Sequence, residues 1–142
     1  QFRYKNWDLS VNLRGAFDYQ VLNFARMFYE NPNIAYNTLD SAYDPAYGTA
    51  VISDIQRYTS YYLEDGDFVK IDNATLGYTF DTGNIDLVQN FRIYASGLNL
   101  YTFTGYKGVD PEVNRLGFAP GNDERDTYPS TRTFTLGVNL TF

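Results

Sequence analysis

The sequence predicts an all-β protein whose antiparallel strands form a wall with one apolar and one polar face. Aromatic residues make up 18% of the 142 residues, with 14 Tyr and 11 Phe, and these side chains favour strands over helices. Four segments alternate between apolar and polar residues, which is the pattern of a strand with two different faces. The links between these segments are unequal in length, so the predicted sheet has a short-turn end and a long-loop end.

The first predicted strand covers residues 2–17 and shows the alternation clearly. Its apolar face carries Trp7, Leu9, Val11 and Leu13. Its polar face carries Asp8, Ser10, Asn12 and Arg14.

The other predicted strands cover residues 67–80, 91–104 and 131–142. The alternation of the third strand is blurred around residues 97–100, which predicts a bulge at the glycine. The fourth strand carries an unbroken series of alternate apolar residues: Phe134, Leu136, Val138, Leu140 and Phe142.

Two long links, residues 18–66 and 105–130, alternate with one short link, residues 81–90. In an antiparallel array both long links fall at the same end of the strands, and the short link falls at the other end. This asymmetry is typical of outer-membrane barrels, which have short periplasmic turns and longer extracellular loops. Within the first long link, the spacing of the apolar residues over residues 21–28 predicts a short helix.

The apolar faces fit a soluble sandwich, in which they pack against a second sheet, or a membrane barrel, in which they face lipid. Each predicted strand is long enough for the roughly 9–11 tilted residues that cross a bilayer. Four strands leave two bare edges, and even small membrane barrels need about eight strands. We therefore favour the barrel and expect the chain to be a piece of a longer polypeptide. Aromatic residues lie where an interfacial girdle belongs: Trp7, Tyr78, Phe80 and Phe142.

Composition argues against several other functions. The chain contains no Cys and no His, so it lacks thiolate and imidazole metal ligands and the commonest general base. The formal net charge of −6 argues against nucleic-acid binding. The pair Asp65 and Asp67 has no nucleophile motif beside it, so we expect neither enzyme activity nor a cofactor.

Four stretches carry a family resemblance. They are KNWDLSVNLRGAF (5–17), YLEDGDFVKIDNATLGYTF (62–80), FRIYASGLNLYTFTGYKGVDPEVN (91–114) and YPSTRTFTLGVNLTF (128–142). The last three resemble the C-terminal end of SusC/RagA-type TonB-linked outer-membrane transporters, and the first is similar to an earlier barrel strand of that family. The resemblance covers nearly the whole chain and is weakest over residues 34–60.

The resemblance implies a 22-stranded barrel in a Bacteroidota-type outer membrane, with an N-terminal plug domain that is absent from this chain. It implies a SusD-like lipoprotein as a lid, energy from the TonB complex, and an oligosaccharide or oligopeptide as cargo. Residues 18–66 and 105–130 would then be extracellular, and residues 81–90 would form a periplasmic turn. The polar face of the first strand would contact water or the plug.

The resemblance also assigns candidate sites. The barrel-assembly machinery would read the last strand through Phe134, Leu136, Val138, Leu140 and Phe142, although Phe142 also fits a plain girdle position. Candidate contacts to substrate or lid are the loop tyrosines Tyr36, Tyr43, Tyr47, Tyr58, Tyr61 and Tyr62, which can equally pack the loop against itself. Acidic residues of the second loop offer oxygen ligands, but their spacing is not that of an EF-hand and Pro111 favours a structural turn, so no metal is predicted: Asp110, Glu112, Asp123, Glu124 and Asp126.

Two other functions stay open at this point. The first is a passive outer-membrane porin or adhesin, which would lack a plug domain upstream of the barrel. The second is a soluble all-β binding module, which would stay in buffer without detergent.

Overall fold

The computed structural model describes residues 1–35, 37–46, 48–81, 83, 89–113, 121–123 and 128–142. The chain divides into two units. The strand unit contains Gln1–Gly15, Val69–Phe103 and Ser130–Phe142, and the loop unit contains Ala16–Phe68 and Thr104–Pro129. In the described part of the chain, no helix is both long and apolar enough to span a membrane.

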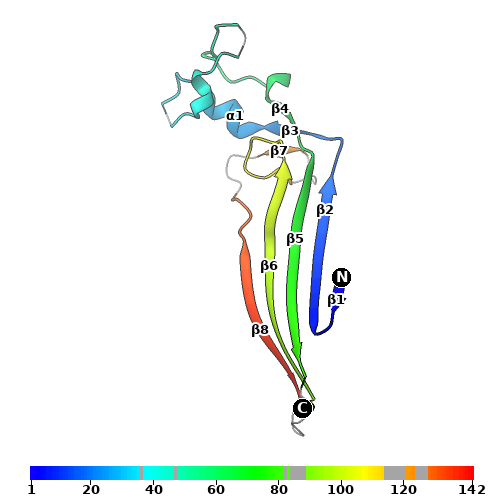
Figure 1. Ribbon diagram of the computed structural model, residues 1–142. Coiled ribbons are helices and arrows are strands. Elements are labelled where there is room, and N and C mark those ends of the chain that lie inside the picture. Colours follow the sequence, from blue (N-terminus) through cyan, green and yellow to red (C-terminus); the bar gives the residue numbers. More distant parts are fainter. Residues whose placement is uncertain (36, 47, 82, 84–88, 114–120, 124–127) are drawn as a thin grey trace. The chain divides into compact units, whose positions relative to one another are not determined.

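The strand unit is a single five-stranded sheet in the order β1-β2-β5-β6-β8. Neighbouring strands run in opposite directions (Figure 1). The prediction of an all-β fold with an antiparallel sheet is confirmed. The strands are β1 (Phe2–Tyr4), β2 (Trp7–Ala16), β5 (Phe68–Phe80), β6 (Asn90–Thr104) and β8 (Thr133–Thr141).

The first predicted strand is wrong in one respect, because the chain reverses direction inside it. Tyr4 lies opposite Trp7, and Phe2 lies opposite Leu9, so β1 and β2 form a hairpin with residues 5–6 as the turn. Lys5 has a left-handed backbone with φ of +52°, which such a tight reversal requires. The alternation hides the turn because the hairpin returns apolar residues to the same face.

The pairing of β6 with β8 fixes the faces of both strands. Ile93 lies opposite Val138, and Arg92 lies opposite Asn139, so apolar residues meet on one face and polar residues on the other. The blurred alternation near residue 97 has a local cause. Asn99 has a left-handed φ of +52°, and the Leu100 side chain occupies the space where a Cβ at Gly97 would lie.

The loop unit has a small sheet of its own in the order β4-β3-β7. Val21, Tyr106 and Val113 form its buried core, and Tyr19 packs against them. The segments of this unit are β3 (Gln20–Asn23), α1 (Phe24–Tyr29), the one-turn helices η1 (Asp40–Tyr43) and η2 (Ser60–Tyr62), β4 (Leu63–Asp65) and β7 (Asn122–Asp123).

The predicted short helix is shorter in the structure than the sequence pattern suggests. The helix predicted over residues 21–28 begins only at Phe24, because Val21 pairs with Glu64 as part of β3. The side chain of Asn23 accepts a hydrogen bond from the Arg26 amide and so caps the start of α1. Most of the predicted turn at residues 81–90 lies outside the described residues.

Candidate functional site

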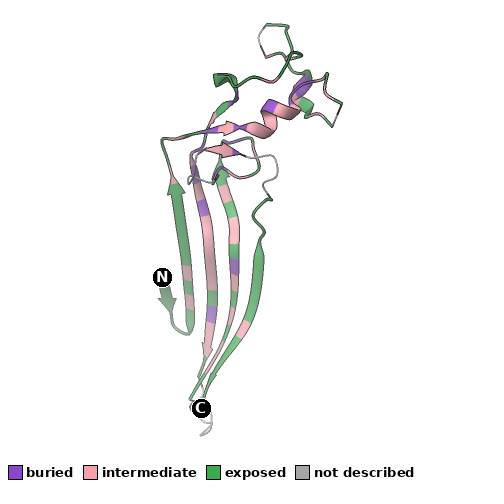
Figure 2. Ribbon diagram, turned by 180° about the vertical axis from the view of Figure 1, so that it is seen from behind, coloured by how far each residue is buried: buried purple, intermediate pink, exposed green. Residues whose placement is uncertain are grey.

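The apolar face of the strand unit is exposed, which is the reverse of a soluble sheet. Leu136 is 83% exposed and Phe134 is 75% exposed, whereas Asp8 and Ser10 on the polar face of β2 are half-buried. Figure 2 shows β8 as exposed along almost all of its length. Exposed apolar area costs roughly 25 cal/mol per Å² in water, so this face requires an apolar environment.

Aromatic rings gather on this sheet near the β1–β2 turn. The ring centroids of Trp7 and Tyr78 lie 4.8 Å apart, as do those of Tyr78 and Phe80. The Phe80 ring also stacks on Phe91 at 4.8 Å. A row of amphipathic rings at one level of a sheet is typical of a strand wall at a membrane surface.

The polar face of the sheet is joined by an ion pair between non-adjacent strands. Arg92 of β6 donates from Nε and Nη2 to the two carboxylate oxygens of Asp8 on β2, at 2.9 and 2.6 Å. A Cβ at Gly77 on the intervening β5 would collide with the Arg92 guanidinium, so glycine at this position opens the path. A bidentate pair of this kind fixes the geometry of the three strands.

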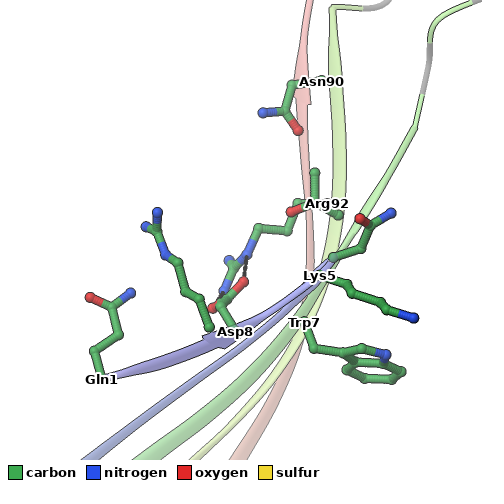
Figure 3. Close-up of a pocket in the computed structure, with 9 residues that line it drawn as sticks. Gln1, Lys5, Trp7, Asp8, Asn90 and Arg92 are labelled. Atoms are coloured by element: carbon green, nitrogen blue, oxygen red, sulfur yellow. Dashed lines mark hydrogen bonds and ion pairs between the residues drawn. The ribbon is translucent and has the colours of Figure 1, made fainter.

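A pocket of about 510 Å³ opens beside this pair (Figure 3). Arg3, Asn6, Thr79 and Asn90 contribute to its lining. Further along the sheet, Arg14 Nε donates to Asp72 at 3.2 Å. The polar face therefore carries charged and hydrogen-bonding groups, which fits a wetted lumen better than lipid.

The loop unit is held together by a buried charge cluster. Arg26 donates from Nε to Glu30 at 2.8 Å and from Nη1 to Glu64 at 2.5 Å. Tyr61 donates its hydroxyl to Glu30 at 3.3 Å, and the Arg26 guanidinium lies over the Tyr61 ring at 5.0 Å from its centroid. Asn23 adds a hydrogen bond to Glu64 at 3.2 Å. One guanidinium thus connects α1, β4 and η2.

The electrostatics of this cluster favour its ionised form. Burial alone would lower the pKa of Arg26, but the hydrogen bonds to Glu30 and Glu64 outweigh it and raise that pKa. Burial and the Glu30 carboxylate raise the pKa of Tyr61, which keeps its hydroxyl as a donor. The bonds of the cluster join α1, β4 and η2, which supports a structural role.

A second buried contact joins two segments of the second long link, residues 105–130. The hydroxyl of Tyr106 donates to Oδ2 of Asp123 at 2.6 Å, and Asp123 is only 1% exposed. Burial and the Asp123 carboxylate raise the pKa of Tyr106, so the phenol stays protonated. Oδ1 of Asp123 is buried and accepts no hydrogen bond from any residue in the described ranges.

We expect Tyr106→Phe to weaken the loop unit by about 1–3 kcal/mol, because it leaves a buried carboxylate with neither oxygen paired. Hydrogen exchange followed by mass spectrometry on the full-length protein measures the loss as reduced amide protection in β3 and β7. Tyr43→Phe, at an exposed ring in the same unit, serves as the control. Equal protection in the two variants would contradict the role assigned to the Tyr106 hydroxyl.

The structure places the predicted residues of the last strand together. All five have exposed side chains, and four of them belong to β8. Their role in assembly stays a prediction. The residues are Phe134, Leu136, Val138, Leu140 and Phe142.

The predicted loop tyrosines fall into different environments. Tyr43 and Tyr58 are strongly exposed, and Tyr61 is partly exposed above Arg26. Tyr62 is 3% exposed and packs edge-on against Tyr61, so its position fits packing within the loop rather than contact with a ligand. Tyr36 and Tyr47 lie outside the described residues.

Asp110, one of the acidic residues considered as an oxygen ligand of a metal, makes a local hydrogen bond. Oδ1 of Asp110 accepts the Glu112 amide at 3.0 Å around Pro111, which is a turn of the expected kind. Glu124 and Asp126 lie outside the described residues. Where the first link meets the next predicted strand, Asp67 accepts the Asp18 amide at 2.7 Å, and Asp65 accepts the Asp67 amide at 3.2 Å.

Comparison with known proteins identifies the family. No family model matches the chain. Over 99% of its length, however, the chain is 32% identical to TonB-dependent receptor P3 of Formosa agariphila, and over 100% it is 31% identical to TonB-dependent receptor SusC of Bacteroides thetaiotaomicron. The chain belongs to the TonB-dependent receptor family. It covers 15% and 14% of the length of these two relatives, so it corresponds to a segment of such a receptor.

Solved structures share the fold of this receptor segment. The RagAB peptide importer in its closed-closed state matches 98% of the chain with a TM-score of 0.81 and 22% identity, and the chain covers 16% of that protein. A structure of the RagAB peptide transporter matches 96% with a TM-score of 0.76 and 23% identity, and the chain again covers 16%. Receptors of the SusC/RagA type are outer-membrane β-barrel proteins, so the sheet has the fold of part of such a barrel.

Sequence reasoning missed the two buried contacts of the receptor's loop unit. Arg26 and Glu64 lie 38 residues apart, and Tyr106 and Asp123 lie 17 apart, without any periodic pattern that links them. The sequence offered one signal for the first contact. Arg26 lies in the predicted helix, residues 21–28, of a loop that is otherwise mainly acidic. That signal indicates an ion pair but does not identify its partners.

Proposed function

We propose that the chain forms part of the wall of an outer-membrane barrel that imports an oligosaccharide or an oligopeptide with energy from TonB. The exposed apolar face of the sheet carries this proposal. Such a face is stable in hydrocarbon, where the strands satisfy each other's backbone groups and the remaining strands of the receptor close the cylinder. The match of the whole chain to TonB-dependent receptors supports the same reading.

In this proposal the two faces of the sheet have different neighbours. Leu76, Ile93 and Leu136 face lipid, and the Asp8–Arg92 pair faces the lumen. The ends of β2 and β6 lead into the two long links, which would be extracellular. The link between β5 and β6 would be a periplasmic turn, and the aromatic rings near the β1–β2 hairpin would mark the periplasmic surface.

The proposed partners lie at the two surfaces of the membrane. A SusD-like lipoprotein would cover the extracellular loops, to which the exposed rings of Tyr43 and Tyr58 offer contact area. The barrel-assembly machinery would read the last strand during insertion. The plug and the segment that contacts TonB would belong to the part of the receptor outside this chain, and the receptor would be a transporter without enzyme activity.

The cargo is proposed at the level of class. RagAB, which shares this fold, is described as a peptide importer, so an oligopeptide is one of the two proposed classes. An oligosaccharide is the other class, which the resemblance of the sequence to SusC/RagA-type transporters implies.

Deletion of the gene that encodes the full-length receptor tests the proposal. We expect the deletion strain to lose growth on at least one oligosaccharide or oligopeptide of a defined panel, and a strain without TonB to lose the same growth. Complementation with the receptor restores growth only where TonB is present. Uptake that continues without TonB would indicate a passive porin instead, and recovery of the receptor in the soluble fraction would exclude a membrane barrel.

A further inference from the structure

The pocket beside the Asp8–Arg92 pair carries more positive than negative charge. Its described lining contains one carboxylate, that of Asp8, and three cationic side chains, those of Arg3, Lys5 and Arg92. The uncharged polar residues of the lining are Asn6, Thr79 and Asn90. The volume of about 510 Å³ lies within the roughly 300–1,000 Å³ of sites that hold small molecules.

The carboxylate of this pocket already has a partner. Arg92 donates to both oxygens of Asp8, at 2.9 and 2.6 Å (Figure 3). Arg3 lies directly opposite Asp8 in the β1–β2 hairpin and therefore on the same polar face. Arg3 is exposed and forms no ion pair with any residue of the described ranges. Its guanidinium, a fork of N–H donors, is thus available to a ligand.

The rest of the sheet shows the same excess of positive charge. The strand unit contains six Lys and Arg residues and four Asp residues, a formal net charge of +2, although the whole chain has a charge of −6. Asp8 and Asp72 are the acidic residues within its strands, and Arg14 binds Asp72 as Arg92 binds Asp8. A ligand in the pocket therefore meets positive charge that the sheet itself does not neutralise, which selects an anionic group.

We propose that Arg3 and Lys5 bind a carboxylate of the cargo as it passes along the polar face, so that the receptor prefers acidic cargo to uncharged cargo. This inference rests on the proposed function, which places the polar face in the lumen. Arginine recognises a carboxylate through two parallel hydrogen bonds, and charged groups along a passage select ions of the opposite sign. Substitutions on the lumen face of a barrel alter selectivity for the same reason. The carboxylate belongs to an acidic side chain in an oligopeptide and to a uronic acid in an oligosaccharide.

Uptake by cells that carry the full-length receptor tests the site. Each member of the growth panel is supplied in an acidic and an uncharged form, with glutamate against glutamine in the peptides and uronic acid against its methyl ester in the saccharides. We expect TonB-dependent uptake to favour the acidic form of at least one member. Arg3→Gln should lower uptake of that form about fivefold, which corresponds to about 1 kcal/mol of lost charge pairing. Arg3→Lys, which keeps the charge, should retain most of it, and neither variant should change uptake of the uncharged form.

Arg132→Gln is the matched control, because Arg132 is exposed and lies before Thr133, at the opposite end of β8 from the partner of Asn90. The amount of each variant in the outer membrane is matched by immunoblot. Equal uptake of the acidic form by Arg3→Gln and Arg132→Gln would overturn the site. An equal loss of both forms in Arg3→Gln would also overturn it, because Arg3 would then hold another part of the receptor rather than cargo.

The same measurement separates this inference from the proposed function. TonB-dependent uptake of uncharged forms alone would keep the proposed function and reject the carboxylate site. Uptake of no member of the panel would reject the proposed function itself. The pair of forms that responds to Arg3→Gln identifies the source of the carboxylate as an oligopeptide or an oligosaccharide.

Discussion

Replacing Leu136 by Arg is expected to destabilise the full-length receptor by about 2–4 kcal/mol. Leu136 lies in the middle of β8, opposite Ala95, on the exposed apolar face. If that face meets lipid, the guanidinium is either transferred into hydrocarbon or drawn toward the surface with distortion of the strand. Leu76→Arg on β5 should have a similar effect for the same reason. Chemical unfolding of the receptor in bilayers measures the change in free energy of unfolding.

Thr135→Arg is the matched control, because Thr135 is the neighbour of Leu136 on the same strand and points to the polar face opposite Ser96. An arginine there meets the side of the sheet that already holds Asp8 and Arg92, so we expect a smaller loss. A similar cost for Thr135→Arg and Leu136→Arg would contradict the assignment of the two faces. A Leu136→Arg protein that gains solubility and loses nothing in stability would contradict the membrane wall itself.

The long strands could be predicted from the sequence because neighbouring residues of a strand lie on opposite faces, and the apolar and polar residues alternate accordingly. It located β5, β6 and β8 to within two residues at each end. It missed the β1–β2 hairpin because a tight turn is usually indicated by glycine, whereas Lys5 and Asn6 occupy this one. The polar face could be predicted as a set, but the partner of Arg92 could not. Arg92 reaches Asp8 two strands away only because Gly77, on the strand between them, has no side chain in the path.

The loop unit was largely beyond sequence reasoning, because long-range polar contacts rather than periodicity determine it. Val21 fits a helical spacing by its apolar neighbours, but its backbone pairs with Glu64 in the small sheet. Asp123 could be proposed as a metal ligand from composition, whereas burial against Tyr106 gives it a structural contact. In both cases a residue more than fifteen positions away decides the local structure.

We expect Arg26→Met to disrupt the loop unit by about 3–5 kcal/mol, because it leaves two buried carboxylates without their cation. The side chains of Glu30 and Glu64 are only 5% and 12% exposed, so water cannot replace the guanidinium without opening the unit. Hydrogen exchange on the full-length receptor should show reduced amide protection in α1, β3 and β4. Amides of the strand unit should stay protected.

Two comparisons separate the loss of the cation from a general effect of the substitution. Arg57→Met removes an exposed arginine from the same unit and should leave protection unchanged. Arg26→Met combined with Glu30→Gln and Glu64→Gln removes the whole set of charges and should recover part of the protection, because no buried charge is then left unpaired. If the triple variant opens as readily as Arg26→Met alone, the packing of the arginine side chain, rather than its charge, holds α1 against the small sheet.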